Sequence, residues 1–440
     1  MLKIYDADTA LKTILHRQPP DELTITPALE ESLAAIFGER LTPNQAVDRI
    51  LKDVRSRGDA ALLDWSARMD GNSSDSLRVP ESEIQAALET LSGEQRLALE
   101  EAASRIRRFH ERQPITSWMT QELGGTLGQL IRPIRRVGLY IPAGTAPLPS
   151  SVLMSAVPAQ VAKVPEIVLA VPPQRKTGKI ASVILAAAAL LGIKEIYAIG
   201  GAQAIAALAY GSESIPAVDK IFGPGNLFVT LAKKAVFGVV GIDTLAGPTE
   251  TVVVADERAR PEWVAADLLA QAEHDVLAAA ILITPSRRLA EAVQAEVAQQ
   301  IESLSRAEII NASLGRRSGI VLTEDLDQAM LLANHYGPEH MCLSVADPWQ
   351  WVSKVQSAGG VFVGEHSFEV LGDYTAGPSH VMPTGGSARY ASPLNVLDFV
   401  HIISLIALDP QTAAQIGPFA ATIARSEGLD AHARAAERRL

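Results

Sequence analysis

One stretch decides the fold class: residues 166–210 read EIVLAVPPQRKTGKIASVILAAAALLGIKEIYAIGGAQAIAALAY. Short runs rich in β-branched residues alternate here with alanine-rich segments of helical length. The pattern predicts strands at 166–171 and 195–199, and helices at 180–191 and 203–210. Such alternation is typical of βαβ units, in which successive strands lie parallel in one sheet. The chain is therefore assigned to the α/β class.

The alternation extends outward on both sides of this stretch. A strand is predicted before it at 137–141, and a helix after it at 262–272. Further strands are predicted at 251–255, 280–284, 320–322, 341–345 and 361–363. We infer two α/β units, the second inserted in the first, with helical N- and C-terminal segments. The predicted divisions are an N-terminal helical arm (1–42), a discontinuous first α/β domain (43–139 and 251–394), an inserted second α/β domain (140–250) and a C-terminal helical segment (395–440).

Composition excludes several classes of protein. The 440 residues include 48% apolar and 20% charged residues, as in a globular enzyme, and the formal charge is 39 − 50 = −11. This balance argues against nucleic acid or an anionic membrane as a partner, because both need a concentrated positive surface. Cys342 is the only cysteine, so no internal disulfide and no cysteine-based zinc cluster can form. We find neither a signal peptide nor a membrane-spanning stretch, and expect a cytoplasmic protein.

Two glycine-rich loops are candidates for nucleotide contacts. No Gly-x-Gly-x-x-Gly fingerprint follows a predicted strand. The two loops are Gly200-Gly201-Ala202-Gln203 and Gly223-Pro224-Gly225-Asn226, each before a predicted helix. Backbone N–H groups at a helix start can hold a pyrophosphate or ribose, but each loop is equally consistent with a tight turn.

Four of the nine histidines lie in short polar clusters. The clusters are Gln271-Ala272-Glu273-His274, Pro338-Glu339-His340, Gly372-Asp373-Tyr374 followed by Gly377-Pro378-Ser379-His380, and Glu427-Gly428-Leu429-Asp430-Ala431-His432. Imidazole with carboxylate and amide oxygens is a suitable ligand set for zinc or manganese. Glu339 beside His340 suits proton transfer and water activation near neutral pH. A single such histidine is more often structural, but four clusters of the same character favour a functional site.

These and other motifs resemble, in the same order along the chain, those of the histidinol dehydrogenase family. The resemblance covers residue 45 to the C-terminus. Its motifs are Val137-Gly138-Leu139-Tyr140-Ile141-Pro142, Gly200-Gly201-Ala202-Gln203-Ala204, Phe222-Gly223-Pro224-Gly225-Asn226, Ala246-Gly247-Pro248-Thr249-Glu250, Asp267-Leu268-Leu269-Ala270-Gln271-Ala272-Glu273-His274, Gly337-Pro338-Glu339-His340, Gly372-Asp373-Tyr374, Gly377-Pro378-Ser379-His380-Val381-Met382-Pro383-Thr384 and Glu427-Gly428-Leu429.

The resemblance implies a zinc-dependent four-electron oxidation in histidine biosynthesis. L-histidinol is converted through L-histidinal to L-histidine, with two NAD and one water. His340 would accept the hydroxyl proton, and Glu339 would activate the water that hydrates the aldehyde. One zinc ion per site would hold the substrate's imidazole and amino nitrogens. The implied zinc ligands are Gln271, His274, Asp373 and His432.

The resemblance also implies the remaining contacts and the assembly. Substrate contacts would come from the zinc ligands and His340, together with Thr249, His380 and Glu427. NAD contacts would come from Tyr140, Gln203 and Asn226. The two α/β domains would be degenerate Rossmann-like units, the inserted one with the NAD contacts and the discontinuous one with the metal and catalytic residues. Members are homodimers in which the C-terminal segment, here 395–440, reaches the partner's site.

Three positions depart from the family pattern, and two alternative functions remain open. Thr249 stands where many members have serine, Ala143 replaces a glycine, and Met341-Cys342 is a less common pair after Pro-Glu-His. One alternative is a related zinc and NAD dehydrogenase of another small polar alcohol, such as a sulfopropanediol. The other is a zinc-retaining relative that binds a metabolite without turnover, which the intact Glu339 and His340 disfavour.

Overall fold

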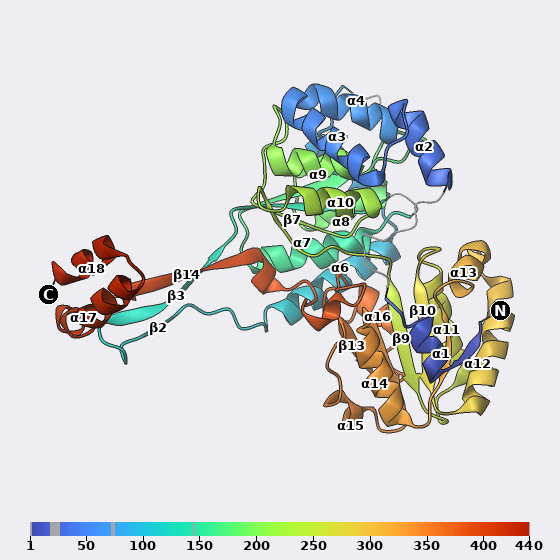
Figure 1. Ribbon diagram of the computed structural model, residues 1–440. Coiled ribbons are helices and arrows are strands. Elements are labelled where there is room, and N and C mark those ends of the chain that lie inside the picture. The colour runs from blue at the N-terminus through green and yellow to red at the C-terminus, as the bar shows by residue number, and fades with distance from the viewer. Residues whose placement is uncertain (1, 18–26, 72–74, 144–145, 440) are drawn as a thin grey trace.

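The computed structural model describes residues 2–17, 27–71, 75–143 and 146–439. It consists of two α/β lobes and an arm that projects away from both (Figure 1). The α/β class and the parallel sheets predicted from the sequence are confirmed. Two predicted segments, residues 18–26 of the N-terminal arm and Gly144 of the loop after Tyr140, lie outside the described residues. No helix in the described part of the chain is long and apolar enough to cross a membrane.

The first lobe contains a five-stranded parallel sheet with the order β6-β5-β4-β7-β8. Its strands are β4 (Arg136–Tyr140), β5 (Glu166–Val171), β6 (Glu195–Ala198), β7 (Lys220–Phe222) and β8 (Gly241–Ile242). Its helices are α2 (Pro27–Phe37), α3 (Pro43–Arg57), α4 (Asp59–Met69), α5 (Glu81–Ala86), η1 (Ala87–Thr90), α6 (Gly93–His110), α7 (Pro149–Val161), α8 (Ser182–Leu190), α9 (Gly201–Tyr210) and α10 (Leu227–Val236).

The strands β4 to β7 each begin with a charged residue and are apolar after it, because helices cover both faces of the sheet. Leu139 packs in one core with α6, α7 and α8, whereas Val168 and Ala170 pack in another with α3, α9 and α10. Residues 43–110, predicted within the discontinuous domain, thus belong to this lobe. The apolar face of a helix indicates that it is buried, but not which sheet it covers.

The second lobe contains a six-stranded parallel sheet with the order β1-β11-β10-β9-β12-β13. Its strands are β1 (Ile4–Asp6), β9 (Glu250–Ala255), β10 (Ala279–Thr284), β11 (Gly319–Leu322), β12 (His340–Ser344) and β13 (Gly360–Val363). Its helices are α1 (Ala7–Lys12), α11 (Pro261–Ala272), α12 (Arg287–Gln300), η2 (Ile301–Ser303), α13 (Ala307–Leu314), α14 (Leu326–Tyr336), α15 (Pro348–Val352) and α16 (Glu369–Tyr374).

The N-terminal segment therefore begins the second lobe instead of forming a separate helical arm. β1 pairs in parallel with β11 at the sheet edge, and Ala10 of α1 belongs to the same apolar core as residues of α14. The first lobe is consequently inserted between β1 and β9, a larger insertion than the predicted 140–250. Three residues of strand are too short for a periodic signal, which explains why the sequence pattern did not indicate β1.

The arm combines a long antiparallel pair with two terminal helices. It contains β2 (Trp118–Thr120), β3 (Thr126–Pro133), β14 (Val400–Ala407), α17 (Pro410–Ser426) and α18 (Asp430–Glu437), and the short helices η3 (Ser387–Arg389) and η4 (Val396–Phe399) precede it. β14 pairs with β3 over eight residues, from Val400↔Pro133 to Ala407↔Thr126. The segment 395–440 is thus helical only in part, because β14 forms with a partner strand far away in the sequence. Apolar side chains remain exposed on the arm, among them Ile402, Ile406, Phe419 and Ile423.

Candidate active site

The predicted site residues outside the C-terminal segment lie where the two lobes meet. Tyr140 ends β4, at the carboxyl edge of the five-stranded sheet, whereas His340 begins β12, at the amino edge of the six-stranded sheet. Ser151, in the first turn of α7, joins the lobes through its Oγ, which lies 3.4 Å from Nε2 of His380. The candidate site therefore lies between the carboxyl edge of one sheet and the amino edge of the other.

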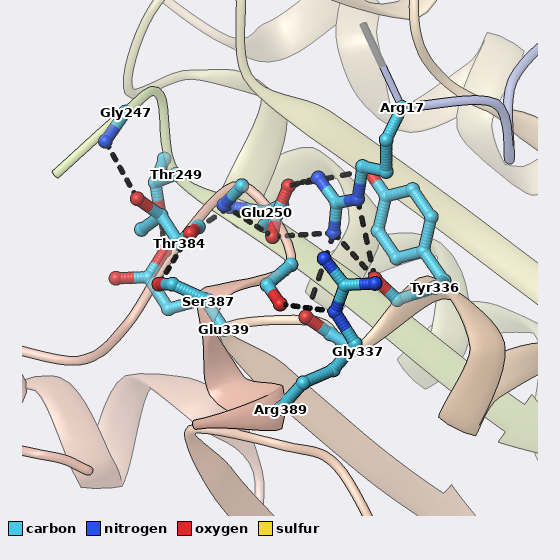
Figure 2. A network of polar contacts seen from close by, with 12 residues as sticks. Arg17, Gly247, Thr249, Glu250, Tyr336, Gly337, Glu339, Thr384, Ser387 and Arg389 are labelled. Carbon is cyan, nitrogen blue, oxygen red and sulfur yellow. Dashed lines mark hydrogen bonds and ion pairs between the residues drawn. The ribbon is translucent and has the colours of Figure 1, made fainter. Parts of the chain in front are cut away.

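Glu339 is a buried carboxylate held by the start of β9. The Thr249 hydroxyl donates to Oε2 of Glu339 at 2.5 Å, and the backbone N–H of Glu250 donates to the same oxygen at 3.1 Å (Figure 2). Burial raises the pKa of Glu339 to about 7, although His340 and the Thr249 hydrogen bond act in the opposite direction. A carboxyl group whose pKa lies near neutrality can take up and release protons at physiological pH, as a general base must.

Thr249 links this carboxylate to Gln271, at the end of α11. The Gln271 amide Nε2 donates to Oγ1 of Thr249 at 2.8 Å, so the hydroxyl accepts from Gln271 and donates to Glu339. This hydrogen bond fixes the amide plane, and Gln271 Oε1 is left buried without a hydrogen-bond partner. An oriented and unsatisfied oxygen inside a protein indicates a ligand position, because leaving it unpaired costs free energy.

His340 lies among three carboxylates. Its Nδ1 is 3.3 Å from Oε1 of Glu369 and its Nε2 is 4.0 Å from Oδ1 of Asp373, and neither ring nitrogen makes an aligned hydrogen bond. Burial lowers the pKa of His340, but Glu369, Glu339 and Asp373 outweigh it and raise that pKa to about 10. A cation beside Asp373 would offset this rise, because it would compete for the same negative charge.

Glu369, which contacts His340, was not indicated by the sequence. It begins α16 and is buried, with one carboxylate oxygen unpartnered. No motif surrounds it in the sequence, so only its position one helical turn before Asp373 could have drawn attention to it. Behind it lies Asp267, whose pKa is raised to about 7 by burial and then by the charges of Glu369 and Glu365.

Asp373, His274 and His380 lie on the same side of the site. Burial raises the pKa of Asp373, whereas the nearby charges of His340, His380 and His274 lower it. Nδ1 of His380 is 2.9 Å from the Asp373 carbonyl oxygen, a contact in which the ring N–H donates. Burial lowers the pKa of His380, which favours the neutral ring, and in that form its Nε2 can accept from the Ser151 hydroxyl.

The side chains of the predicted ligands are of the chemical types that bind zinc, but one chain brings together only part of the predicted set. In the described ranges of the chain, no three His, Cys, Asp or Glu side chains are grouped so as to hold a metal ion. Gln271 supplies an amide oxygen, and Asp373 and His274 supply a carboxylate and an imidazole. His432, the fourth predicted ligand, is not among the residues brought together here.

The two predicted C-terminal site residues lie on the projecting arm. Glu427 follows the last turn of α17, and His432 lies on α18; both are exposed. Figure 1 shows these helices far from α11 and α16, which carry Gln271 and Asp373. Glu427 and His432 therefore do not reach the site of their own chain.

The predicted NAD contacts gather at the carboxyl edge of the five-stranded sheet. Gln203 is buried, and its Nε2 donates to Oδ2 of Asp70 at 3.1 Å, while Oε1 is unpartnered. Tyr140 is also buried, and its hydroxyl accepts from the Gly201 N–H at 3.3 Å. Asn226 is exposed and caps α10 by accepting from Phe228 N and Val229 N.

A buried ion pair clamps the loop that carries Asn226. Lys233 donates to Asp243 and, at 2.9 Å, to the carbonyl oxygen of Gly223. Asp243 in turn accepts from the Gly223 N–H at 2.7 Å. Gly223 has φ +111°, and a Cβ there would lie 2.0 Å from the Tyr140 carbonyl oxygen, so only glycine fits. The pair thereby fixes both the N–H and the carbonyl oxygen of Gly223, and with them the loop that follows.

Comparisons with known proteins agree on one family. The family model described as histidinol dehydrogenase matches residues 39–440. A histidinol dehydrogenase from Deinococcus radiodurans is 53% identical over 421 residues, 95% of this chain and 96% of that protein. One from Dechloromonas aromatica is 46% identical over 425 residues, 95% and 98% of the two chains. A crystal structure of histidinol dehydrogenase from Elizabethkingia anophelis aligns with a TM-score of 0.90 at 34% identity, over 100% of this chain and 98% of that one.

Proposed function

The chain belongs to the histidinol dehydrogenase family, and we propose that it oxidises L-histidinol through L-histidinal to L-histidine with one zinc ion per site and two NAD. The resemblance inferred from the sequence motifs is thereby confirmed, and with it the assignment to the NAD-dependent oxidoreductases. The metal, the cofactor contacts and the division of chemical roles are our proposals.

The observation that carries the proposal is the relay from Gln271 through Thr249 to Glu339. One hydroxyl orients both the proposed metal ligand Gln271 and the buried carboxylate of Glu339. This arrangement holds a base near a substrate-binding ion, as a two-step oxidation of a chelating alcohol requires. The threonine that departs from the family's serine retains this hydroxyl, so the departure preserves the relay.

In the proposed first half-reaction, His340 takes the proton of the substrate hydroxyl as the alcohol carbon loses a hydride. Glu369 lies at 3.3 Å and stabilises the imidazolium that forms. In the second half-reaction, Glu339 takes a proton from the water that adds to the aldehyde, and loss of a second hydride gives the acid. NAD, held by Tyr140, Gln203 and Asn226, would accept the hydrides.

Gln271, His274, Asp373 and His432 would hold the zinc, with Thr249, His380 and Glu427 beside the substrate. Zinc there would fix the substrate's imidazole and amino nitrogens, and so set the distance between the reacting carbon and His340. A metal ion whose role is to position the substrate is consistent with a ligand set that includes an amide and two imidazoles.

A steady-state assay distinguishes this proposal from its alternatives. We expect NADH formation with histidinol and none with dihydroxypropane sulfonate, because an imidazole can bind the zinc and a sulfonate cannot replace it. Preference for the sulfonate would assign the chain to the related alcohol dehydrogenases. Binding of histidinol without turnover would identify a non-catalytic binding protein.

We also propose a homodimer in which each arm completes the partner's site. The exposed apolar side chains of the arm, with Ile406 72% and Phe419 69% exposed, need a surface to cover them. His432 lies on the same arm, and one chain alone lacks the fourth ligand. A two-fold dimer with crossing arms satisfies both requirements.

Hybrid dimers of two inactive variants test the crossing. In a hybrid of His340→Ala and His432→Ala chains, one site inherits both changes and the other neither. Random mixing makes about half the dimers hybrid, so about a quarter of all sites should regain activity. A purified hybrid as inactive as its parents would show that each arm serves its own chain.

A further inference from the structure

The N-terminal segment contacts the first residue of β9, Glu250, through Arg17. β1 joins the edge of the six-stranded sheet and α1 follows, so the chain arrives beside the start of β9. Arg17 precedes the residues 39–440 that the family model matches. None of the proposed roles in metal, substrate or NAD binding includes it.

Arg17 is bound tightly at this position (Figure 2). Its guanidinium makes two hydrogen bonds to the Glu250 carboxylate, the one from Nη2 at 2.7 Å. It also donates to the Tyr336 carbonyl oxygen, from Nη2 at 2.8 Å and from Nε at 3.2 Å, and stacks 3.6 Å from the centroid of the Tyr336 ring. A two-pronged arginine contact of this kind fixes orientation as well as charge.

Glu250 connects this cation to the catalytic carboxylate. Its side chain, only 4% exposed, accepts from Arg17, from the Gly385 N–H at 3.0 Å and from the Tyr336 hydroxyl at 3.3 Å. Its own backbone N–H is one of the two donors to Glu339. The side chain of Glu250 therefore anchors the peptide that holds Glu339.

We propose that Arg17 is a positioning residue for Glu339 and supports the aldehyde-oxidising half-reaction. Arg17 is the only cation among the Glu250 contacts described above. Without it, the buried Glu250 carboxylate must turn towards water or take up a proton. Either change moves the start of β9 and with it the N–H and hydroxyl that bind Glu339. The inference rests on the proposed function, because it assigns the water-activating role to Glu339.

The charges act in the same direction as the geometry. The Glu250 carboxylate raises the pKa of Glu339. A guanidinium paired with Glu250 opposes this effect and favours the ionised Glu339 that a general base requires. As long as Glu250 stays ionised beside it, removal of Arg17 therefore weakens the base as well as displacing it.

The test compares the two half-reactions in Arg17→Met, Arg17→Lys and the control Arg49→Met. Arg49 makes a similar ion pair with Glu39, but that pair is exposed and remote from the site. NADH formation is measured with histidinol and histidinal supplied separately, and Tm is recorded for each variant. The ratio of the two kcat values does not depend on how much of the enzyme is folded.

For Arg17→Met we expect kcat with histidinal to fall about tenfold more than kcat with histidinol, as displacement of a reacting group by a fraction of an ångström can cause. Arg17→Lys keeps the positive charge but not the two-pronged contact, so its ratio of kcat values should lie between those of Arg17→Met and the wild type. Arg49→Met should leave the ratio unchanged. If Arg17→Met does not fold, the lysine variant alone decides.

An unchanged ratio in the folded Arg17 variants would overturn the inference, because a purely structural role lowers both half-reactions equally. Failure of the proposed function looks different: the wild-type enzyme itself would not oxidise histidinol.

Discussion

Replacing Glu339 by glutamine should separate the two oxidations. Glutamine matches glutamate in size and keeps an oxygen that accepts from the Glu250 N–H, so the fold around β9 should persist. The amide cannot take a proton from water, and loss of a general base typically costs 10²–10⁴-fold in rate, or about 3–5 kcal/mol in barrier height. We expect this loss in histidinal oxidation and a loss below about tenfold in histidinol oxidation, where His340 is the base.

The pH profile supplies a second check on the same residue. The pKa of Glu339 lies at about 7, raised from 4.5 by burial, and only the ionised form is a base. Histidinal oxidation by the wild-type enzyme should therefore decline as pH falls through about 7, and Glu339→Gln should abolish this inflection. NADH formation with each substrate supplied separately gives both results. Equal loss of both oxidations in Glu339→Gln, with the inflection retained, would refute the division of roles between Glu339 and His340.

Three further predictions concern the metal, stability and cofactor binding. Chelation should abolish turnover but leave the circular dichroism spectrum almost unchanged, since the cores of both lobes do not include the metal site; full activity of metal-free enzyme would contradict the ligand assignment. Burial raises the pKa of Asp267 from 3.8 to about 7, so the protonated side chain stabilises the folded state. This contribution to the free energy of unfolding, up to about 4 kcal/mol, is complete below pH 4 and is lost as pH rises through 7. Asp267→Asn should thus flatten the pH dependence of Tm between pH 4 and 8. An unaltered pH dependence would contradict the proposal that Asp267 is protonated in the folded protein. Lys233→Met removes the hydrogen bond to the Gly223 carbonyl oxygen and leaves Asp243 without its cationic partner, so it should raise KM for NAD by about tenfold with a smaller change in kcat. An unchanged KM would show that this ion pair does not support NAD binding.

Local patterns in the sequence predicted much of the fold and the centre of the site. The apolar run at 166–171 became β5 with the same bounds, and the strand predicted at 280–284 became β10 with one added residue. Glu339 and His340 could be selected because their chemistry is visible in adjacent residues. In such cases the determining interactions lie within one element.

Features that depend on distant partners were not predictable in the same way. β14 is stabilised as a strand by its pairing with β3, and the two strands are separated by more than half the length of the chain. Glu369 and Arg17 are ordinary charged residues in the sequence, and their partners His340 and Glu250 meet them only after the lobes fold. Tertiary proximity, which no single-sequence periodicity encodes, defines these parts of the site.

The stoichiometry of a completed reaction tests the central claim most directly. A limiting amount of L-histidinol is exhausted by the zinc-loaded enzyme with excess NAD, and NADH and the final product are both quantified. The proposed pair of bases, Glu339 and His340 in one site, predicts two NADH for each histidinol and L-histidine as the product. One NADH for each histidinol with accumulation of the aldehyde, or no NADH at all, would contradict the four-electron oxidation.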